Sequence, residues 1–445
     1  MKRILAINPW IFDFAAFDLW IKPLGLIYII SILKEYDCEI SFIDCLDRYE
    51  PLMKDYYSKI SRAYFPDGRG KFYKEEISKP AILKNIPRIY GRYGFTEEVL
   101  LKKLDDVKEP DIILITSMMT YWYPAVFRMI EILKARYKKC KIVLGGIYTI
   151  LFPEHAKKYS GADFVLNTSD LNYITDFILK ILEMSVRKKD YNNFNNVPMP
   201  DYSYYSYNPF ICIMSTKGCL FDCAFCASKV LSPHYSAKEP IKFVDELELL
   251  QEKYNVSNFV FYDDALFINP ENHIKIILKE IIRRKLKTTF QTPNAVHAKF
   301  IDEELAELMK LTNFQNIRIG YESFNPKRQE EMMNKVNNEE LEKSIKNLLK
   351  VGFTRKDIGV YYIIGFPDET YEELKAGIDY ILSLGAHCRL ADYSPVPYTK
   401  YWFKYNNFNK EEPLLHNNSI FFELVNPHLK EKYHELKNYV KQFYN

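Results

Sequence analysis

Three cysteines near the middle of the chain are the residues best placed to do chemistry. Cys219, Cys223 and Cys226 are spaced Cys-x3-Cys-x2-Cys. The chain has eight cysteines in 445 residues, too few for a disulfide scaffold, and this cluster of them indicates metal binding. A cubane iron-sulfur cluster takes four thiolates, so three ligands from one loop would leave one iron open to a substrate or cofactor.

Two other metal sites remain as alternatives to this open site. Structural zinc needs a fourth ligand, usually from a second cysteine or histidine pair, and no such pair follows in the sequence. Cys212 could complete a closed electron-transfer cluster, although a single cysteine between apolar neighbours is more often buried. We therefore predict an open iron-sulfur site, with a closed cluster and zinc as the alternatives.

The elements around the cysteines alternate between apolar strands and helices, which predicts an open α/β barrel of six strand-helix units over residues 209–400. The cysteine loop directly follows the first of these strands. The expected strands cover residues 210–215, 258–262, 288–291, 316–320, 357–364 and 389–394. A short helical tail over 401–445 is expected to follow, ending in one amphipathic helix over 426–444.

The first 185 residues predict a separate α/β domain with a doubly wound parallel sheet, because buried strands again alternate with helices. In such sheets ligands bind beyond the carboxyl ends of the strands, where the strand order reverses. The residues at such ends are Asn8, Thr116, Ser117, Gly145 and Gly146. We expect a ligand face there, although the two glycines could equally form a tight turn.

Two segments interrupt this pattern. Residues 47–106 form an insertion rich in Lys, Arg and Tyr, which could clasp an anionic ligand or could be a solvated, partly helical cap. Residues 186–208 are polar, contain Pro198 and Pro200 and lack periodicity, which predicts a domain linker.

The composition excludes several classes of protein. Lys plus Arg is 61 and Asp plus Glu is 58, a net charge of +3, so there is no nucleic-acid signature. The longest apolar stretch, 24–33, is about half the roughly 20 residues that a membrane span needs. Pro9, Asp13 and Asp18 interrupt the apolar start, which argues against a signal peptide and favours a cytoplasmic location.

The cysteine loop resembles the signature of the radical SAM superfamily, which has an aromatic residue before the last cysteine, here Phe225. The resemblance implies that the cysteines hold a 4Fe-4S cluster whose open iron binds S-adenosylmethionine (SAM). Electron transfer would then release methionine and a 5′-deoxyadenosyl radical. A flavodoxin- or ferredoxin-like protein would donate the electron.

Further landmarks of that family follow in order, at the ends of later strands. The residues that the resemblance implies as SAM contacts are Asp263, Asp264, Gln291, Asn294, Glu322, Ser323 and Gly365. One of the two aspartates could instead cap a turn, and Glu322 could instead form an ion pair with Arg318. Tyr398 stands where relatives usually have glycine, which leaves the geometry of that loop open.

The order of α/β domain, linker and barrel is similar to the branch of radical SAM enzymes that carries an N-terminal cobalamin-binding domain. That likeness implies cobalamin near the strand ends of the first domain, and methylation of an unactivated carbon. The first histidine is His155, so no imidazole is available in the expected loop to ligate cobalt from below. The alternatives are a cobalamin-independent radical SAM enzyme, or an iron-sulfur protein for electron transfer or interaction. The substrate, a small molecule or a peptide, is not identified by the sequence.

Overall fold

The computed structural model describes residues 1–185 and 187–444, and in it the chain divides into two units. One unit comprises Met1–Phe210 with Lys410–Leu415, and the other Ile211–Asn409 with His416–Asn445. The division falls just after the predicted linker over residues 186–208. Two residues lie outside the described part of the chain: Val186, the first residue of that linker, and Asn445, at the end of the predicted tail. The sequence did not indicate that Lys410–Leu415 would group with the first unit.

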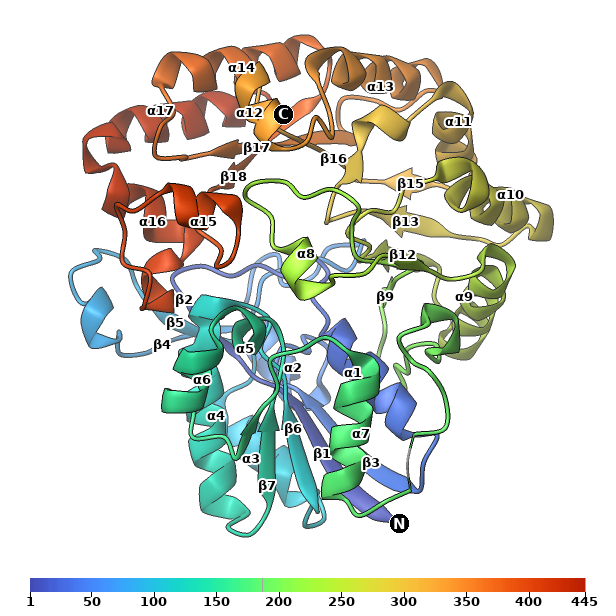
Figure 1. The fold of residues 1–445 in the computed structure, drawn as a ribbon, viewed down its shortest axis with the longest axis vertical. Helices are drawn as coiled ribbons and strands as arrows, with labels where there is room; N and C mark the ends of the chain where they lie inside the picture. Colours follow the sequence, from blue (N-terminus) through green and yellow to red (C-terminus); the bar gives the residue numbers. More distant parts are fainter. Residues whose placement is uncertain (186, 445) are drawn as a thin grey trace. The chain divides into compact units, whose positions relative to one another are not determined.

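The first unit is built on a sheet of five parallel strands in the order β3-β1-β6-β7-β8 (Figure 1). From β1 the chain moves to β3 on one side and later to β6 on the other, so the strand order reverses between β1 and β6. The strands are β1 (Lys2–Asn8), β3 (Cys38–Asp44), β6 (Ile112–Ile115), β7 (Lys141–Leu144) and β8 (Phe164–Val165).

Helices cover both faces of this sheet because its strands are apolar on both sides. On one face, alternate strand residues such as Ile4 and Leu114 pack with Ile30 and Ile178 from two of the helices. The other alternate residues, such as Leu5, are buried as well. The helices are α1 (Leu24–Leu33), α3 (Glu97–Asp105), α4 (Tyr123–Arg136), α5 (Ile147–Leu151), α6 (Pro153–Tyr159) and α7 (Leu171–Ile181).

The insertion forms a small antiparallel sheet together with the segment that follows β1. Its strands are β2 (Ile11–Asp13), β4 (Lys74–Glu76) and β5 (Gly91–Tyr93), with α2 (Lys54–Tyr57) before them in the insertion. The basic side chains here have acidic partners: Arg48 lies buried 2.7 Å from Asp18, and Arg92 lies 2.6 Å from Glu75. These pairs favour the cap over the anion clasp.

The second unit contains two four-stranded parallel sheets, in the orders β15-β13-β12-β9 and β14-β16-β17-β18. Only Asn316, with a φ of 48°, separates β15 from β16, so one stretch of chain runs through both sheets. The strands are β9 (Ile211–Ile213), β12 (Asn258–Phe261), β13 (Thr289–Gln291), β14 (Val296–His297), β15 (Phe314–Gln315), β16 (Ile317–Glu322), β17 (Ile358–Ile364) and β18 (His387–Asp392).

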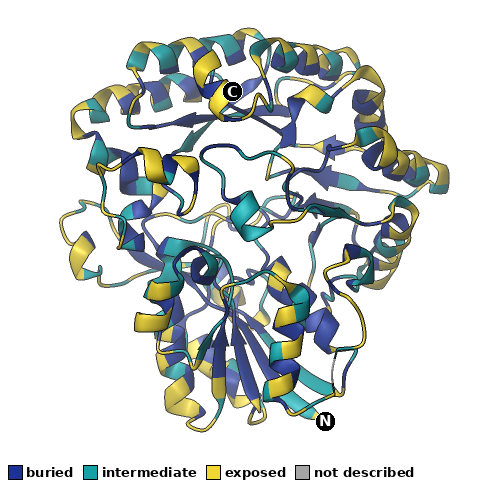
Figure 2. Cartoon of the chain, in the orientation of Figure 1, coloured by how far each residue is buried: buried dark blue, intermediate teal, exposed yellow. Residues whose placement is uncertain are grey.

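Helices alternate with these strands along the chain, and the outer faces of the helices are exposed (Figure 2). Their amphipathic pattern explains this arrangement: in α13, for instance, Leu341, Ile345 and Leu348 are buried. The helices are α9 (Pro240–Tyr254), α10 (Ile274–Arg284), α11 (Glu303–Leu311), α12 (Pro326–Glu331), α13 (Asn338–Lys350) and α14 (Tyr371–Ser383). None of the helices in the described part of the chain has the length and apolarity needed to cross a bilayer.

The end of the chain forms three further helices, α15 (Lys400–Lys404), α16 (Asn418–Val425) and α17 (Lys430–Lys441). The single helix expected over 426–444 is therefore shorter, because Pro427 opens a separate 3-10 turn before α17. Tyr439 of α17 donates a hydrogen bond of 2.8 Å to Asp379 of α14, which fixes the last helix against the outside of this unit.

Candidate functional site

The cysteine loop leaves and returns to the second unit through a short antiparallel pair. β10 (Thr216–Lys217) and β11 (Ser236–Ala237) pair at its base, and the short helix α8 (Ser228–Leu231) follows Cys226. Gly218 opens the loop with a φ of 80°, and a Cβ there would lie 2.7 Å from the carbonyl oxygen of His234. Only glycine accepts both conditions, so the loop starts at a defined point.

The three thiols lie in two adjoining apolar clusters: Cys223 and Cys226 pack in one, Cys219 packs in the other, and Phe221 contacts both. Cys219 and Cys223 are each 7% exposed. The Cys219 sulfur accepts a hydrogen bond from the N–H of Phe221 at 3.4 Å, and the Cys226 sulfur accepts one from the N–H of Ser228 at 3.5 Å. Donors aimed at sulfur favour a thiolate, which is the form that binds metal. In the protein without metal, burial raises the pKa of Cys223 to about 12.

The donor set fits a three-thiolate iron-sulfur site. Burial raises the pKa of both Cys219 and Cys223, and each of these thiols also feels the charges of Cys226 and Lys335. Cys212 lies instead in the middle of β9, opposite Val260, and is fully buried. The structure therefore favours a packing role for Cys212, as expected for a lone cysteine in an apolar strand.

The segment after α12 holds the cysteine loop from one side. The carbonyl oxygen of Glu331 accepts a hydrogen bond from the N–H of Ala224 at 3.2 Å. The carbonyl oxygen of Met332 accepts one from the thiol of Cys223 at 3.5 Å. The N–H of Asp222 lies 2.9 Å from the sulfur of Met333, which has a φ of 59°. The loop is thereby fixed by residues more than 100 positions later in the chain.

Arg328 connects this support to a second loop. Its guanidinium is 5% exposed and donates to the Tyr401 hydroxyl at 3.3 Å and to Asp368 at 3.1 Å. The backbone N–H of Tyr401 donates to the carbonyl of Ala224 at 2.9 Å. One buried cation therefore supports both the cysteine loop and the segment that carries Asp368.

Both predicted aspartates hold the start of the cysteine loop. Asp263 accepts hydrogen bonds from the backbone N–H and the hydroxyl of Ser215 at 3.0 and 2.8 Å, and from the N–H and hydroxyl of Thr216 at 2.5 and 2.8 Å. Asp264 accepts a hydrogen bond from the N–H of Gly218. Burial raises the pKa of both carboxyls, to about 6 for Asp263. The carboxylate of Asp263 is already occupied by four donors, so Asp264 is the better placed of the two for a cofactor.

Glu322 pairs with a lysine that the sequence did not single out. Its carboxylate lies 2.7 Å from the ammonium of Lys335, so Glu322 forms an ion pair with a partner other than the Arg318 that the sequence suggested. Glu322 has a φ of 71°, and the pairing of β16 with β17 shifts between Gly320 and Glu322. Such left-handed backbone in a non-glycine residue is concentrated at functional sites.

The other predicted residues at the strand ends differ in how far they are available. Gln291 is fully buried and exchanges hydrogen bonds with the side chains of Asn258 and Asn316, at 3.3 and 3.0 Å. Asn294 donates to the carbonyl of Tyr262 at 2.9 Å, and Ser323 accepts from the N–H of Asn325 at 3.2 Å. The side chain of Gln291 is therefore used in hydrogen bonds within the sheet, whereas the amide oxygen of Asn294 is available to accept a hydrogen bond.

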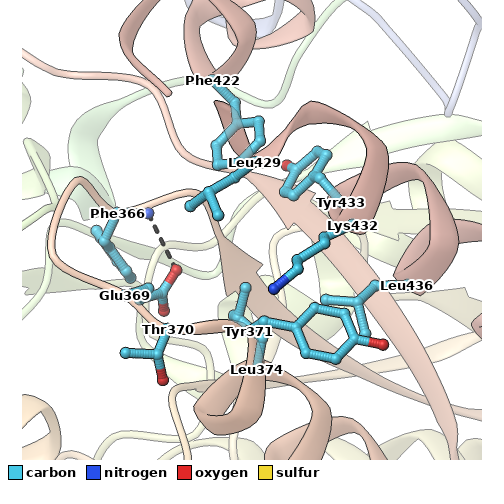
Figure 3. Close-up of a pocket in the computed structure, with 10 residues that line it drawn as sticks. All are labelled: Phe366, Glu369, Thr370, Tyr371, Leu374, Phe422, Leu429, Lys432, Tyr433 and Leu436. Atoms are coloured by element: carbon cyan, nitrogen blue, oxygen red, sulfur yellow. Dashed lines mark hydrogen bonds between the residues drawn. The ribbon is translucent and has the colours of Figure 1, made fainter. Parts of the chain in front are cut away.

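Gly365 begins a loop that a buried carboxyl holds in shape. Glu369 accepts hydrogen bonds from the N–H groups of Gly365 and Phe366 at 2.9 and 3.1 Å, and Figure 3 shows the second of these. Gly365 has a φ of 101°, and a Cβ there would lie 3.0 Å from Phe422. Burial raises the pKa of Glu369 to about 8. The pocket drawn in Figure 3 lies behind this loop and is walled mainly by apolar side chains of α14, α16 and α17.

Phe225 lies within the cysteine loop, and Tyr398 lies in the loop that follows β18. Phe225 packs beside Cys223 and Cys226, and the ammonium of Lys335 lies 5.7 Å from its ring centre. Tyr398 has a φ of 66°, the conformation that glycine adopts most easily. The loop therefore keeps its left-handed turn with tyrosine in that place.

The predicted ligand face of the first unit is a pocket at the point where its strand order reverses. The residues that line this sheet-edge pocket are Asn8, Pro9, Trp10, Leu46, Thr116, Ser117, Met118, Trp122 and Val126. Three of the five predicted residues, Asn8, Thr116 and Ser117, thus come together here. The side-chain amide of Asn8 donates to Asp44 at 2.7 Å and is partly used within the sheet.

Two polar atoms at the sheet-edge pocket are buried without a partner among the residues that the structure describes. These are the indole Nε1 of Trp10 and the hydroxyl of Ser117. Buried polar groups nearly always find partners, so a ligand with hydrogen-bonding groups fits this place. Gly146 has a φ of 106°, and a Cβ there would lie 2.5 Å from the Ser117 carbonyl oxygen, whereas a Cβ at Gly145 would meet nothing within 4 Å. Gly146 thus lets β7 approach Ser117.

Sequence reasoning gave no role at the site to Lys335, Arg328 or Glu369, and it interpreted His297 as a surface or packed histidine. His297 is buried and stacks on Phe221 of the cysteine loop, with ring centres 5.1 Å apart, and burial lowers its pKa to about 3. Its Nδ1 lacks a hydrogen-bond partner within the described part of the chain. These four residues are isolated charged or polar residues in helices, strands and loops, and no local spacing marks them.

Comparison with known proteins agrees with an iron-sulfur site in the cysteine loop. Residues 213–381 match the model of the Radical SAM superfamily. An uncharacterised methyltransferase of Pyrococcus horikoshii is 25% identical over 332 residues, which cover 68% of this chain and 70% of that protein.

Two solved structures share the fold. The radical S-adenosylmethionine methyltransferase TsrM of Kitasatospora setae, solved with cobalamin and a [4Fe-4S] cluster bound, aligns with a TM-score of 0.63 at 15% identity over 91% of this chain and 78% of that one. The cobalamin-dependent S-adenosylmethionine radical enzyme OxsB, solved with aqua-cobalamin and S-adenosylmethionine, aligns with a TM-score of 0.59 at 14% identity over 95% of this chain and 56% of that one.

Proposed function

We propose that this chain, whose residues 213–381 form a radical SAM domain, is a cobalamin-dependent enzyme that methylates an unactivated carbon. The observation that carries the proposal is the buried loop of Cys219, Cys223 and Cys226, with N–H donors aimed at two of the sulfurs. The likeness to TsrM and OxsB, both of which bind cobalamin, supports the second cofactor.

In this proposal the second unit is an open barrel of six parallel strands that holds the cluster and SAM. The strand pairing β9-β12-β13-β15 and its continuation through β16, β17 and β18 support that description. A 4Fe-4S cluster bound to the three thiolates would supply an electron and an open iron for the amino and carboxylate groups of SAM. Asp264, Asn294, Glu322, Ser323 and Gly365 are the residues that we assign to contact SAM.

The protein's own contribution is mainly to preorganise the site. Asp263 ties the end of β12 to the start of the cysteine loop, and Arg328 holds the far side of the loop through Tyr401. The sulfur ligands therefore need little rearrangement when the cluster binds. Phe221, His297 and Phe225 restrict the access of water to the thiols.

We assign the predicted domain over residues 1–185, which lies within the first unit, to cobalamin. Methylcobalamin would supply a methyl group that an unactivated carbon cannot take directly from a sulfonium. Trp10 and Ser117 would each provide a hydrogen bond to polar groups of the cofactor, and Gly146, which lies close to the Ser117 backbone, would leave Ser117 in its place. Asn8 and Thr116 complete this lining.

The experiment is an anaerobic reconstitution with iron, sulfide and hydroxocobalamin, followed by metal analysis. We expect about four iron atoms per chain from the cubane, one cobalt, and 5′-deoxyadenosine on addition of SAM and a reductant. Release of S-adenosylhomocysteine in the same reaction would support methyl transfer through cobalamin.

Each half of the proposal has its own contradicting result. Protein without iron, or with a cluster that does not respond to SAM, would overturn the radical SAM assignment of the cysteine loop. Protein that cleaves SAM but takes up no cobalt, and yields no S-adenosylhomocysteine, would leave the radical chemistry and remove cobalamin.

A further inference from the structure

Lys335 is a buried cation beside the cysteine loop. Its side chain is 12% exposed, and its ammonium lies 2.7 Å from Glu322, which is 10% exposed. Burial alone would lower the pKa of Lys335, but Glu322, Cys223 and Cys226 outweigh it and the pKa is raised. The lysine is therefore charged, and its ammonium lies 5.7 Å from the ring centre of Phe225, the residue before Cys226.

The backbone around Lys335 is shaped to bring this charge to the site. The two residues before it, Met333 and Asn334, follow Met332 with φ values of 59° and 47°, and this turn follows the contacts that hold Cys223 and Ala224. A Cβ on Gly320 would lie 3.2 Å from the ammonium and 2.9 Å from the Glu322 carboxylate. A side chain at position 320 would thus crowd the ion pair, and glycine leaves it room.

We propose that Lys335 is a positioning residue that sets the reduction potential of the cluster by placing a fixed positive charge next to it. This inference rests on the proposed function, because it assumes a cluster on the three cysteines. A cubane of charge 2+ on three thiolates has a net charge of −1, and one electron makes it −2. Little water reaches the buried thiols to stabilise the added charge, so a nearby cation favours the reduced form.

Glu322 acts against the lysine and holds it in place. In the Lys335→Met variant the ammonium is lost and Glu322 remains as an unpaired anion beside the cluster. In Glu322→Gln the lysine keeps its charge and loses the opposing one. The two substitutions should therefore shift the potential in opposite directions, which a loss of packing would not do.

The test is a redox titration of the reconstituted cluster, followed by electron paramagnetic resonance, in the full-length protein without SAM. For Lys335→Met we expect the equilibrium constant for reduction to fall at least tenfold, which is about 59 mV for one electron. Lys335→Arg should stay within about threefold of the wild type because it keeps the charge. Glu322→Gln should raise the constant.

Lys299→Met is the matched control. The Lys299 ammonium lies 5.9 Å from the ring centre of Phe221 in the same loop, but the residue is exposed, so water and salt screen its charge. We expect this variant to titrate like the wild type.

Several results would overturn the inference. One is a Lys335→Met variant with full iron content and the wild-type potential; another is a shift that appears only after SAM is added. If Lys335→Met holds no cluster, Glu322→Gln decides: an unchanged or lower potential contradicts the electrostatic role. A wild-type protein without iron would instead contradict the proposed function, before any variant is made.

Discussion

The cysteine loop and the sheet-edge pocket are two candidate sites built on opposite principles. Around the cysteines the carboxylates and the guanidinium mostly serve to hold the loop: Asp263 has four donors, and Arg328 binds both Tyr401 and Asp368, although Arg328 Nε and His297 Nδ1 lack partners within the described residues. At the sheet-edge pocket the indole of Trp10 and the hydroxyl of Ser117 lack partners within the described residues. A site that binds through strong metal-sulfur bonds needs fixed ligands, whereas one that binds through hydrogen bonds needs free ones.

Removal of a ligand should have the largest effect. Cys223→Ala leaves two thiolates, so we expect iron content after reconstitution to fall to less than about a tenth of the wild type and 5′-deoxyadenosine formation to be abolished. Iron analysis and chromatography of the reaction products measure both. Cys140→Ala, at a half-exposed cysteine of the first unit, is the control. Equal loss in Cys212→Ala would show that Cys212 is a ligand after all and that the cluster is closed.

Removal of the support should cost stability. Arg328→Met keeps much of the volume but leaves the Tyr401 hydroxyl and Asp368 without their charged donor, so we expect the second unit to lose about 2 kcal/mol of unfolding free energy. Urea denaturation followed by circular dichroism measures this loss. Lys327→Met, at the neighbouring exposed position of α12, should change stability by less than about 0.5 kcal/mol. An unchanged Arg328→Met protein would mean that the loop is held mainly by its backbone hydrogen bonds.

The buried carboxyl of Glu369 should make stability depend on pH. Its pKa of about 8 in the folded protein exceeds the ordinary value of 4.5, so the folded state binds the proton more tightly. Its contribution is fully present below about pH 4.5 and is lost as the pH rises towards and through 8, by up to about 1 kcal/mol per pH unit. Denaturation of the wild type and of Glu369→Gln at pH 6.0, 7.0 and 8.5 tests this prediction, because the glutamine variant should show a flatter dependence. Parallel curves for the two proteins would contradict it.

The smallest effect is expected at the sheet-edge pocket, and it should separate binding from stability. Ser117→Ala removes a hydroxyl that has no partner among the described residues, so the unfolding free energy should stay within about 0.5 kcal/mol of the wild type. Cobalamin affinity should fall about two- to tenfold, the value of one hydrogen bond. Equilibrium dialysis with hydroxocobalamin measures the affinity. A large loss of stability would show that Ser117 supports the fold and that the two sites are not built so differently.

Much of the fold follows from local patterns in the sequence. The strands of the parallel sheets are apolar runs in the sequence, and the helices of the second unit are amphipathic stretches. Most of these elements therefore lie within a few residues of their expected bounds. The expected helix over 426–444 is shorter because Pro427 cannot continue a helix from the preceding residues. The grouping of Lys410–Leu415 with the first unit has no local signal, because it depends on packing: Glu412, for example, accepts a hydrogen bond from Tyr123 at 3.1 Å.

In the candidate sites, too, some residues could be predicted from local patterns and others could not. Spacing alone pointed to Cys219, Cys223 and Cys226, and strand ends pointed to Asn8, Thr116 and Ser117. Sequence spacing did not show that Asp263 and Gln291 are used within the fold, because their partners lie 25 to 48 residues away. Lys335 lies beside Glu322 because the chain turns at Met333, which is far from the cysteines in the sequence.

The amino-acid sequence by itself determined the trio of candidate ligand thiols and the order of two α/β units, since both follow from the spacing of residues along the chain. The tertiary structure alone decided which polar groups are consumed in holding the loop and which are left for a ligand. The reason is physical: a hydrogen bond or an ion pair depends on separation in space, and only folding brings Lys335, Glu322 and the cysteine loop into one buried place.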